Sequence, residues 1–185
     1  MKKTILPVLL LGALASAHPG HGAHGLLAGM AHPWTGADHL AAMMAVGTWA
    51  SLLPGRSKWV PPAVFLWAMT VGFLTGWTGF VLPGTEVGIL LSLVVIGSAL
   101  AFLWRPGIAT VATATAACAF VHGQAHGVEA PTNASGAAFA IGFLLSTAAL
   151  HLGGMALGNL LREHKVLLRL GGAGMIALAG ALAVL

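Results

Sequence analysis

Charged residues are nearly absent from this chain, and their scarcity limits what it can fold into. Of its 185 residues only 6% are Asp, Glu, Lys or Arg, while 58% are hydrophobic. A soluble domain carries about 25% charged residues, because its surface must be hydrated. Disorder, in turn, requires low hydrophobicity. The composition therefore excludes an ordinary soluble domain and predicts a protein that crosses a membrane several times.

The first 17 residues have the pattern of a targeting segment. Two lysines at positions 2 and 3 precede a short apolar stretch, and an A-x-A cleavage pattern ends at residue 17. This arrangement is typical of a cleavable bacterial signal peptide. The mature chain would then begin outside the cytoplasm at His18. His18 and His21 lie in a Gly- and Pro-containing stretch, where they would either capture metal ions or form part of a solvated leader.

Six apolar segments follow this leader, and each is about as long as a bilayer span, which takes about 20 residues. Turn-forming residues, with Pro at most of the breaks, separate the segments. The expected spans are 25–53, 60–82, 86–104, 107–127, 136–158 and 166–185. We therefore predict an all-α membrane protein, with six transmembrane helices forming one transport domain over residues 18–185.

Lysine and arginine in the connections predict the orientation. With the mature N-terminus outside, all six of these cations fall in the inner loops or beside them, and the outer connections contain none. Inner loops of membrane proteins carry such an excess. We expect a bacterial inner-membrane protein with both mature termini on the periplasmic side and, without a basic stripe, no nucleic-acid partner. The six cations are Arg56, Lys58, Arg105, Arg162, Lys165 and Arg169.

The predicted orientation also relates the two halves of the chain. Spans one to three begin outside and spans four to six begin inside, so the two halves would have opposite orientations, as in a 3+3 inverted repeat.

Ionisable residues inside a span are costly, so each is a functional candidate. The first expected span contains His32, Asp38 and His39. The two histidines are two helical turns apart and share a face, whereas Asp38 would point elsewhere on a straight helix. Pro33 and Gly36 lie between them, and a helix broken there could bring all three together. The carboxylate could then bind a metal ion directly or orient a histidine that does.

A second group of ionisable residues occupies the fourth expected span. His122, His126 and Glu129 have the spacing i, i+4, i+7, which places them on one helix face. Two histidines four residues apart can chelate one ion. In the fifth span, His151 could continue the same pathway toward the cytoplasm or only hydrogen-bond across helices. Together these residues predict a ladder of weak, shared sites of the kind that a cation conductor needs.

The donor types narrow the choice of ion. Imidazole and carboxylate suit Ni, Co, Zn, Cu(II) and Fe. The four acids of the chain are too few to supply an all-oxygen site for Mg or Ca, and one cysteine cannot form a Cys-rich metal site. We expect no resident cofactor. The residues alone do not separate nickel from cobalt or zinc.

Other functions remain open from the residues alone. One is a membrane metal-binding accessory or sensor protein without transport. Another is a metallohydrolase that uses His122 and His126 with Glu129 as base, although Gly123 occupies the position of the base in the usual zinc-protease motif. A third is a haem protein with one histidine from each of two helices. We expect transport, and therefore no enzyme.

The chain resembles the HupE/UreJ family of bacterial membrane proteins over essentially its whole length. The resemblance rests on three stretches: His32-Pro33-x-x-Gly36-x-Asp38-His39, His122-Gly123-x-Ala125-His126-Gly127-x-Glu129, and Leu150-His151 with Gly153-Gly154. Val121 stands where the family often has phenylalanine. The resemblance implies uptake of Ni²⁺, or in some members Co²⁺, for hydrogenase or urease maturation. It also implies a transport site formed by His32, Asp38 and His39 together with His122, His126 and Glu129.

Overall fold

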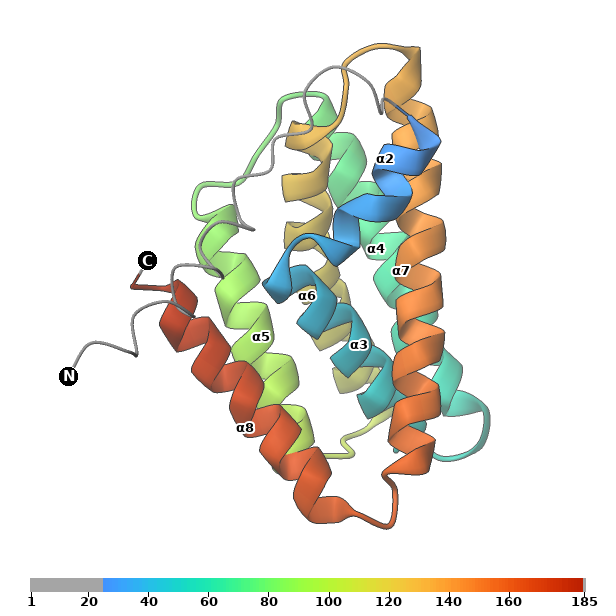
Figure 1. Cartoon of the computed structure of the whole chain (residues 1–185), viewed down its shortest axis with the longest axis vertical. Helices are drawn as coiled ribbons and strands as arrows, with labels where there is room; N and C mark the ends of the chain where they lie inside the picture. The colour runs from blue at the N-terminus through green and yellow to red at the C-terminus, as the bar shows by residue number, and fades with distance from the viewer. Residues whose placement is uncertain (1–24, 185) are drawn as a thin grey trace, which may run out of the picture.

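A computed structural model describes residues 25–184, and every regular element in that range is helical. The helices lie side by side in an elongated bundle (Figure 1). In chain order the elements are α2 (Leu26–Ala31), η1 (His32–Trp34), α3 (Ala37–Ser51), η2 (Gly55–Trp59), α4 (Val60–Trp77), α5 (Thr85–Ala101), α6 (Ile108–Glu129), α7 (Ala134–Leu160) and α8 (Lys165–Leu182). The predicted all-α architecture is confirmed. The predicted signal peptide, His18 and His21 lie outside the described residues.

Helix length decides how much of the six-span prediction the fold supports. In the part of the chain that the structure describes, four helical segments are long and apolar enough to cross a bilayer. They are η2 with α4 (Gly55–Trp77), α6 (Ile108–Glu129), most of α7 (Ser135–Leu160) and α8 (Lys165–Leu182). The third expected span is represented by α5, which has 17 residues. At 1.5 Å per residue α5 would cover about 25 Å of a hydrocarbon core about 30 Å thick. The fold thus supports a multi-pass membrane protein, and the number six remains a prediction.

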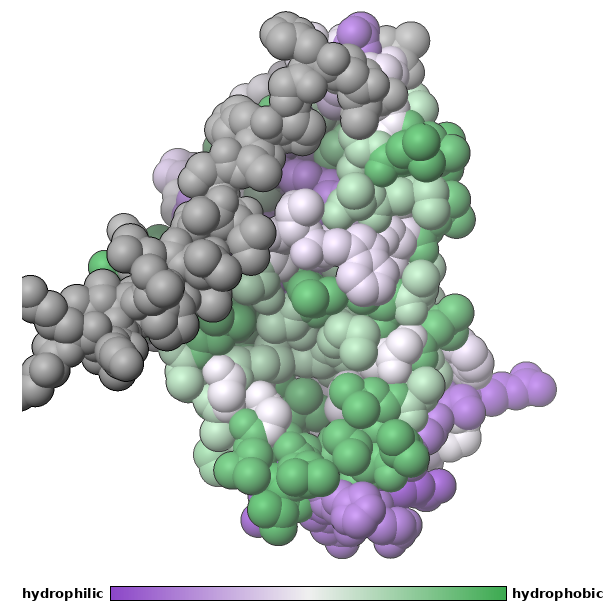
Figure 2. All heavy atoms as spheres, in the orientation of Figure 1, coloured by the Kyte–Doolittle hydropathy of each residue, from purple (hydrophilic) through white to green (hydrophobic). Residues whose placement is uncertain are grey.

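The connections between helices alternate between the two ends of the bundle. The α4–α5 and α6–α7 connections lie at one end, and the α3–α4, α5–α6 and α7–α8 connections lie at the other (Figure 1). The six cations expected on the inner side all belong to the second group or its flanks. Figure 2 shows hydrophilic residues gathered at that end, below an apolar surface. This separation is what the orientation prediction requires, while the direction of the chain in a membrane remains a prediction.

The first expected span is interrupted where Pro33 and Gly36 indicated a break. Helix α2 ends at Ala31, a 3-10 turn containing Pro33 follows, and Gly36 precedes α3 with extended backbone (φ −97°, ψ 121°). Proline has no N–H to continue the helical hydrogen bonds. A Cβ atom on Gly36 would lie 2.8 Å from Oδ1 of Asp38 and 3.2 Å from Nδ1 of His39. Because glycine has no Cβ atom, position 36 leaves room for the contact between the Asp38 and His39 side chains.

Glycines allow two pairs of helices to touch through their backbones. A Cβ atom at Gly72 of α4 or at Gly123 of α6 would collide with a backbone carbonyl group of the other helix. Gly47 of α3 and Gly154 of α7 have the same relation to each other's helices. Small residues permit this approach in membranes, where van der Waals contact is a main source of helix association. The two helices that carry the histidine motifs are thus each fixed to a different partner.

The pairing of helices bears on the predicted inverted repeat. Helix α4 packs on α6, the α2–α3 segment packs on α7, and α5 packs on α8. In a 3+3 repeat, span one matches span four, span two matches span five and span three matches span six. A contact between spans one and five in one half is therefore repeated as a contact between spans four and two. The contact between the third and sixth spans corresponds to itself. The observed pairing has this form, and the repeat remains a prediction.

We expect Gly123→Ala to weaken the packing of α4 against α6. The added methyl group meets backbone atoms that cannot turn aside, and overpacking of this kind costs about 1–3 kcal/mol. Gly174→Ala in α8 is the matched control, because a Cβ atom there has no neighbour within 4 Å. Thermal unfolding in detergent should show a lower Tm for Gly123→Ala and an unchanged or higher Tm for Gly174→Ala. Equal Tm values for the two variants would contradict the backbone contact.

Candidate metal centre

Four imidazole rings from the first and fourth expected spans meet beside the break between α2 and α3. The ring centroid of His126 lies 4.8 Å from that of His32 and 4.6 Å from that of His39. The centroids of His39 and His122 are 4.8 Å apart. His122 and His126 are 0% exposed. The histidines of the two sequence motifs therefore form one group, which we call the histidine cluster.

The histidine cluster opens at the end of α6. Oε2 of Glu129 lies 2.8 Å from Nε2 of His32, and the Glu129 side chain is 57% exposed. One potential ligand atom from each of His32, His126 and Glu129 lies within 4.8 Å of the others. Glu129 and Glu86 also line a surface hollow of about 340 Å³. A cation that approaches this end would therefore meet carboxylates before it meets imidazole.

Asp38 makes its contacts with His39. Its Oδ1 accepts a hydrogen bond from the backbone N–H of His39 at 2.8 Å and lies 2.8 Å from Nδ1 of the same residue. An ionised carboxylate can only accept, so Nδ1 carries the proton and Nε2 keeps a free lone pair. Nε2 is buried and has no hydrogen-bond partner in the described part of the chain. Of the two roles that the sequence left open for Asp38, this geometry favours orienting the histidine.

Unpartnered nitrogen atoms distinguish this region from the rest of the interior. Seven buried side-chain polar atoms within residues 25–184 lack a hydrogen bond, and six are imidazole nitrogens. They are Nε2 of His39, Nδ1 of His122, and both ring nitrogens of His126 and of His151. An unpaired buried polar group costs about 1–3 kcal/mol, so the fold retains a costly set of unpartnered nitrogens. In a neutral ring one nitrogen carries a proton and the other a free lone pair. Imidazole lone pairs beside a carboxylate are a donor set that suits a divalent transition-metal ion.

His151 is buried apart from the histidine cluster. Its ring centroid lies 4.9 Å from that of Phe65, which in turn is 6.0 Å from that of His122. The Phe65 ring therefore connects the cluster to His151. The predicted ligands from Glu129 to His122 lie in contact one after another, whereas the Phe65 ring lies between His122 and His151. That these residues pass an ion along remains a prediction.

Gln124 belongs to the second motif, but its contacts lie with the α4–α5 connection. Its amide nitrogen donates to Oγ1 of Thr75 and to the carbonyl oxygen of Phe80, at 3.2 and 3.1 Å. Its Oε1 accepts from the backbone N–H of Leu82 and from the Thr85 hydroxyl, both at 3.3 Å. The side chain is fully buried. Gln124 thus holds the connection that follows α4 and is not available as a ligand.

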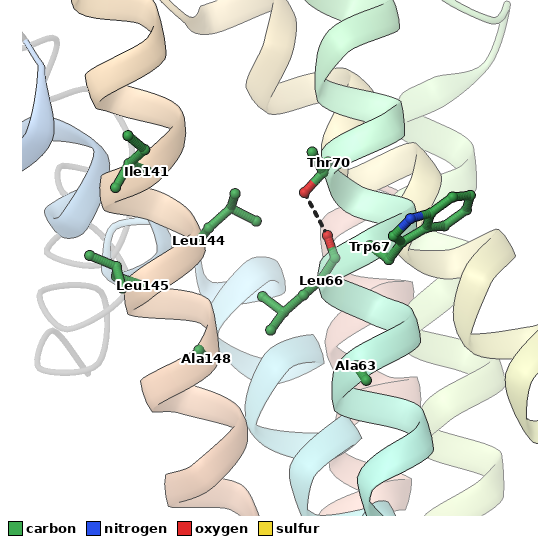
Figure 3. A pocket seen from close by; sticks show the side chains of 8 residues that line it. All are labelled: Ala63, Leu66, Trp67, Thr70, Ile141, Leu144, Leu145 and Ala148. Carbon is green, nitrogen blue, oxygen red and sulfur yellow. Dashed lines mark hydrogen bonds between the residues drawn. The ribbon is translucent and has the colours of Figure 1, made fainter.

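A larger hollow, of about 490 Å³, lies between α4 and α7 (Figure 3). The Thr70 hydroxyl in its wall donates to the backbone carbonyl of Leu66 at 2.8 Å. The residues that line it are Ala63, Leu66, Trp67, Thr70, Ile141, Leu144, Leu145 and Ala148. This lining offers a cation neither imidazole nor carboxylate, so the hollow is not the metal site.

The chain is similar to known proteins over nearly its whole length. The family described as HupE / UreJ protein matches residues 6–183. The chain belongs to the HupE / UreJ family. It is 39% identical over 180 residues to Protein HupE of Rhizobium leguminosarum bv. viciae, across 96% of this chain and 94% of that protein. No solved structure is significantly similar to the chain. The resemblance identified from the sequence motifs is confirmed.

Two side chains of this HupE / UreJ protein that touch the histidine cluster were missed by the sequence analysis. Oγ of Ser92, in α5, lies 2.7 Å from Nε2 of His122. Phe65, in α4, contacts the rings of His122 and His151. Both stand alone in apolar runs and belong to none of the motifs. Only the packing of α4 and α5 against α6 brings them to the site.

Proposed function

We propose that this protein takes up divalent nickel or cobalt across the membrane, with the histidine cluster and Glu129 as the ligands. The observation that carries the proposal is the contact of four imidazole rings beside an exposed carboxylate. Within residues 25–184, three of these rings keep at least one buried nitrogen without a hydrogen-bond partner. Nickel and cobalt bind well to imidazole and carboxylate. The uptake activity that the family resemblance implies agrees with this chemistry.

The geometry suggests an order of steps. The ion first meets Glu129 at the open end and then binds between His32 and His126. Because the ring of His126 is also 4.6 Å from that of His39, the ion can exchange one ligand at a time toward His122. Shared sites of this kind permit both entry and release. His151 would receive the ion after it passes Phe65, and His18 and His21 would collect ions on the periplasmic side.

A second candidate is a metal-binding accessory or sensor protein that does not transport. The observation in its favour is Phe65, because an aromatic ring interrupts the series of ligands between His122 and His151. In this case the histidine cluster would hold one ion and release it to the side from which it came. The two candidates differ in the number of ions that each protein molecule moves.

Metal uptake by whole cells tests the proposal. Cells that express the protein are compared with empty-vector cells in medium with trace Ni, Co, Zn, Fe and Cu, and their metal content is measured by mass spectrometry. We expect a selective gain of nickel or cobalt. Purified protein in sealed vesicles then separates the two candidates. Transport fills the vesicle interior with many ions per protein molecule, whereas binding alone stops near a fixed stoichiometry. No gain in cells, despite confirmed insertion in the membrane, would contradict uptake.

A further inference from the structure

Ser92 brings a hydroxyl group to the buried side of the histidine cluster. It lies in α5 and is 2% exposed. Its Oγ donates a hydrogen bond to the carbonyl oxygen of Ile89 at 2.7 Å. The same Oγ lies 2.7 Å from Nε2 of His122, in the facing helix α6. Ser92 therefore links the backbone of α5 to one particular nitrogen of one histidine ring.

The number of hydrogen atoms available decides the direction of this second bond. A serine hydroxyl has one hydrogen and two lone pairs. If that hydrogen points to Ile89, then His122 must donate from Nε2 for both short contacts to be hydrogen bonds. A neutral imidazole protonated at Nε2 has a free lone pair at Nδ1. Nδ1 of His122 is one of the buried atoms without a hydrogen bond in the described range.

We propose that Ser92 is a positioning residue of the metal site, which holds His122 as the Nε2–H tautomer and so presents Nδ1 to the metal ion. This role rests on the proposed function. It complements that of Asp38, which holds His39 with the opposite nitrogen protonated. The two neighbouring histidines would then bind the ion through different ring atoms. A partner outside the ligand set commonly fixes the tautomer and the ring orientation of a ligating histidine.

Equilibrium binding of nickel alone to the purified protein in detergent tests this role. We expect Ser92→Ala to weaken nickel binding about 10–100-fold, the usual effect of losing such a partner. Ser92→Thr should restore most of the affinity, because a threonine hydroxyl in a helix also bonds a carbonyl group one turn earlier. Ser98→Ala, at a half-buried position of the same helix, should leave binding unchanged. Nitrogen-15 shifts of labelled histidine should show that His122 loses its Nε2–H tautomer in Ser92→Ala.

A double-mutant cycle separates positioning from packing. If Ser92 acts through His122, then adding Ser92→Ala to His122→Ala causes no further loss of affinity. An equal loss in both backgrounds would overturn the role, and so would wild-type affinity in Ser92→Ala. If the wild-type protein binds no nickel at all, the proposed function fails and this role fails with it. Wild-type binding that is unaffected by Ser92→Ala removes the role and leaves the proposed function standing.

Discussion

His126→Ala should reduce nickel or cobalt uptake to the level of cells without the protein, a loss of more than about 100-fold. Removing a residue that only hydrogen-bonds to a metal ligand lowers metal affinity or activity about 10–100-fold. Removing a ligand at the centre of the cluster should therefore lower uptake by more. His126 touches both His32 and His39, so its removal separates the outer part of the series from the inner part. The ring also stacks on Phe143, with 4.9 Å between the ring centroids, and phenylalanine offers the ion no ligand atom in place of the imidazole. Initial rates of radioactive nickel uptake measure the effect.

The matched control is His164→Ala. His164 is exposed at the start of α8, at the end of the bundle where the cationic connections lie. We expect uptake by His164→Ala to equal that of the wild type. Membrane fractions must contain equal amounts of the two variants. If His126→Ala takes up nickel at the wild-type rate under those conditions, the histidine cluster is not the pathway.

Asp38→Asn should lower uptake about 10–100-fold with little change in protein stability. The carboxylate accepts from both nitrogens that His39 directs to it. An amide can donate as well as accept, so it does not fix which ring nitrogen of His39 is protonated. It also removes the negative charge that makes His39 a better ligand. The measurement is the nickel concentration for half-maximal uptake, together with the maximal rate.

Two comparisons identify the cause of the loss in Asp38→Asn. Glu163→Gln removes an acid that is 86% exposed, near the start of α8, and should have no effect on uptake. His39→Ala combined with Asp38→Asn should be no worse than His39→Ala alone, since residues that act as a unit are not additive. Additive losses would show that Asp38 binds the ion independently, as a ligand in its own right.

The break in the first span could be predicted from the sequence because it depends on local chemistry. Pro33 removes a helical hydrogen bond, and Gly36 has no side chain to fill the space beside Asp38. The common face of His122 and His126 also follows from helical geometry alone. That the two motifs would form one site was implied by the family resemblance, and the rings of the two motifs lie close together. That they bind an ion together remains a prediction.

The roles of Ser92, Phe65 and Gln124 could not be predicted in the same way. Amphipathic patterns locate the buried face of a helix in water, but lipid tails are as apolar as a protein core. The apolar runs of α4 and α5 therefore do not indicate which side faces α6. Gln124 stands inside a metal-binding motif, yet its bonds reach a connection 39 to 49 residues away. Such contacts depend on the whole bundle.

The glycine contacts constrain how the site could open. His32 and His39 lie on the segment fixed to α7, whereas His122 and His126 belong to the helix fixed to α4. Neither helix can slide far along its partner, because backbone atoms meet backbone atoms at each glycine. A rearrangement would move each pair as a rigid body and part the two along the line where the rings touch. Any such motion would move the histidines of the first motif away from those of the second as two groups, instead of widening the spaces between all of them evenly.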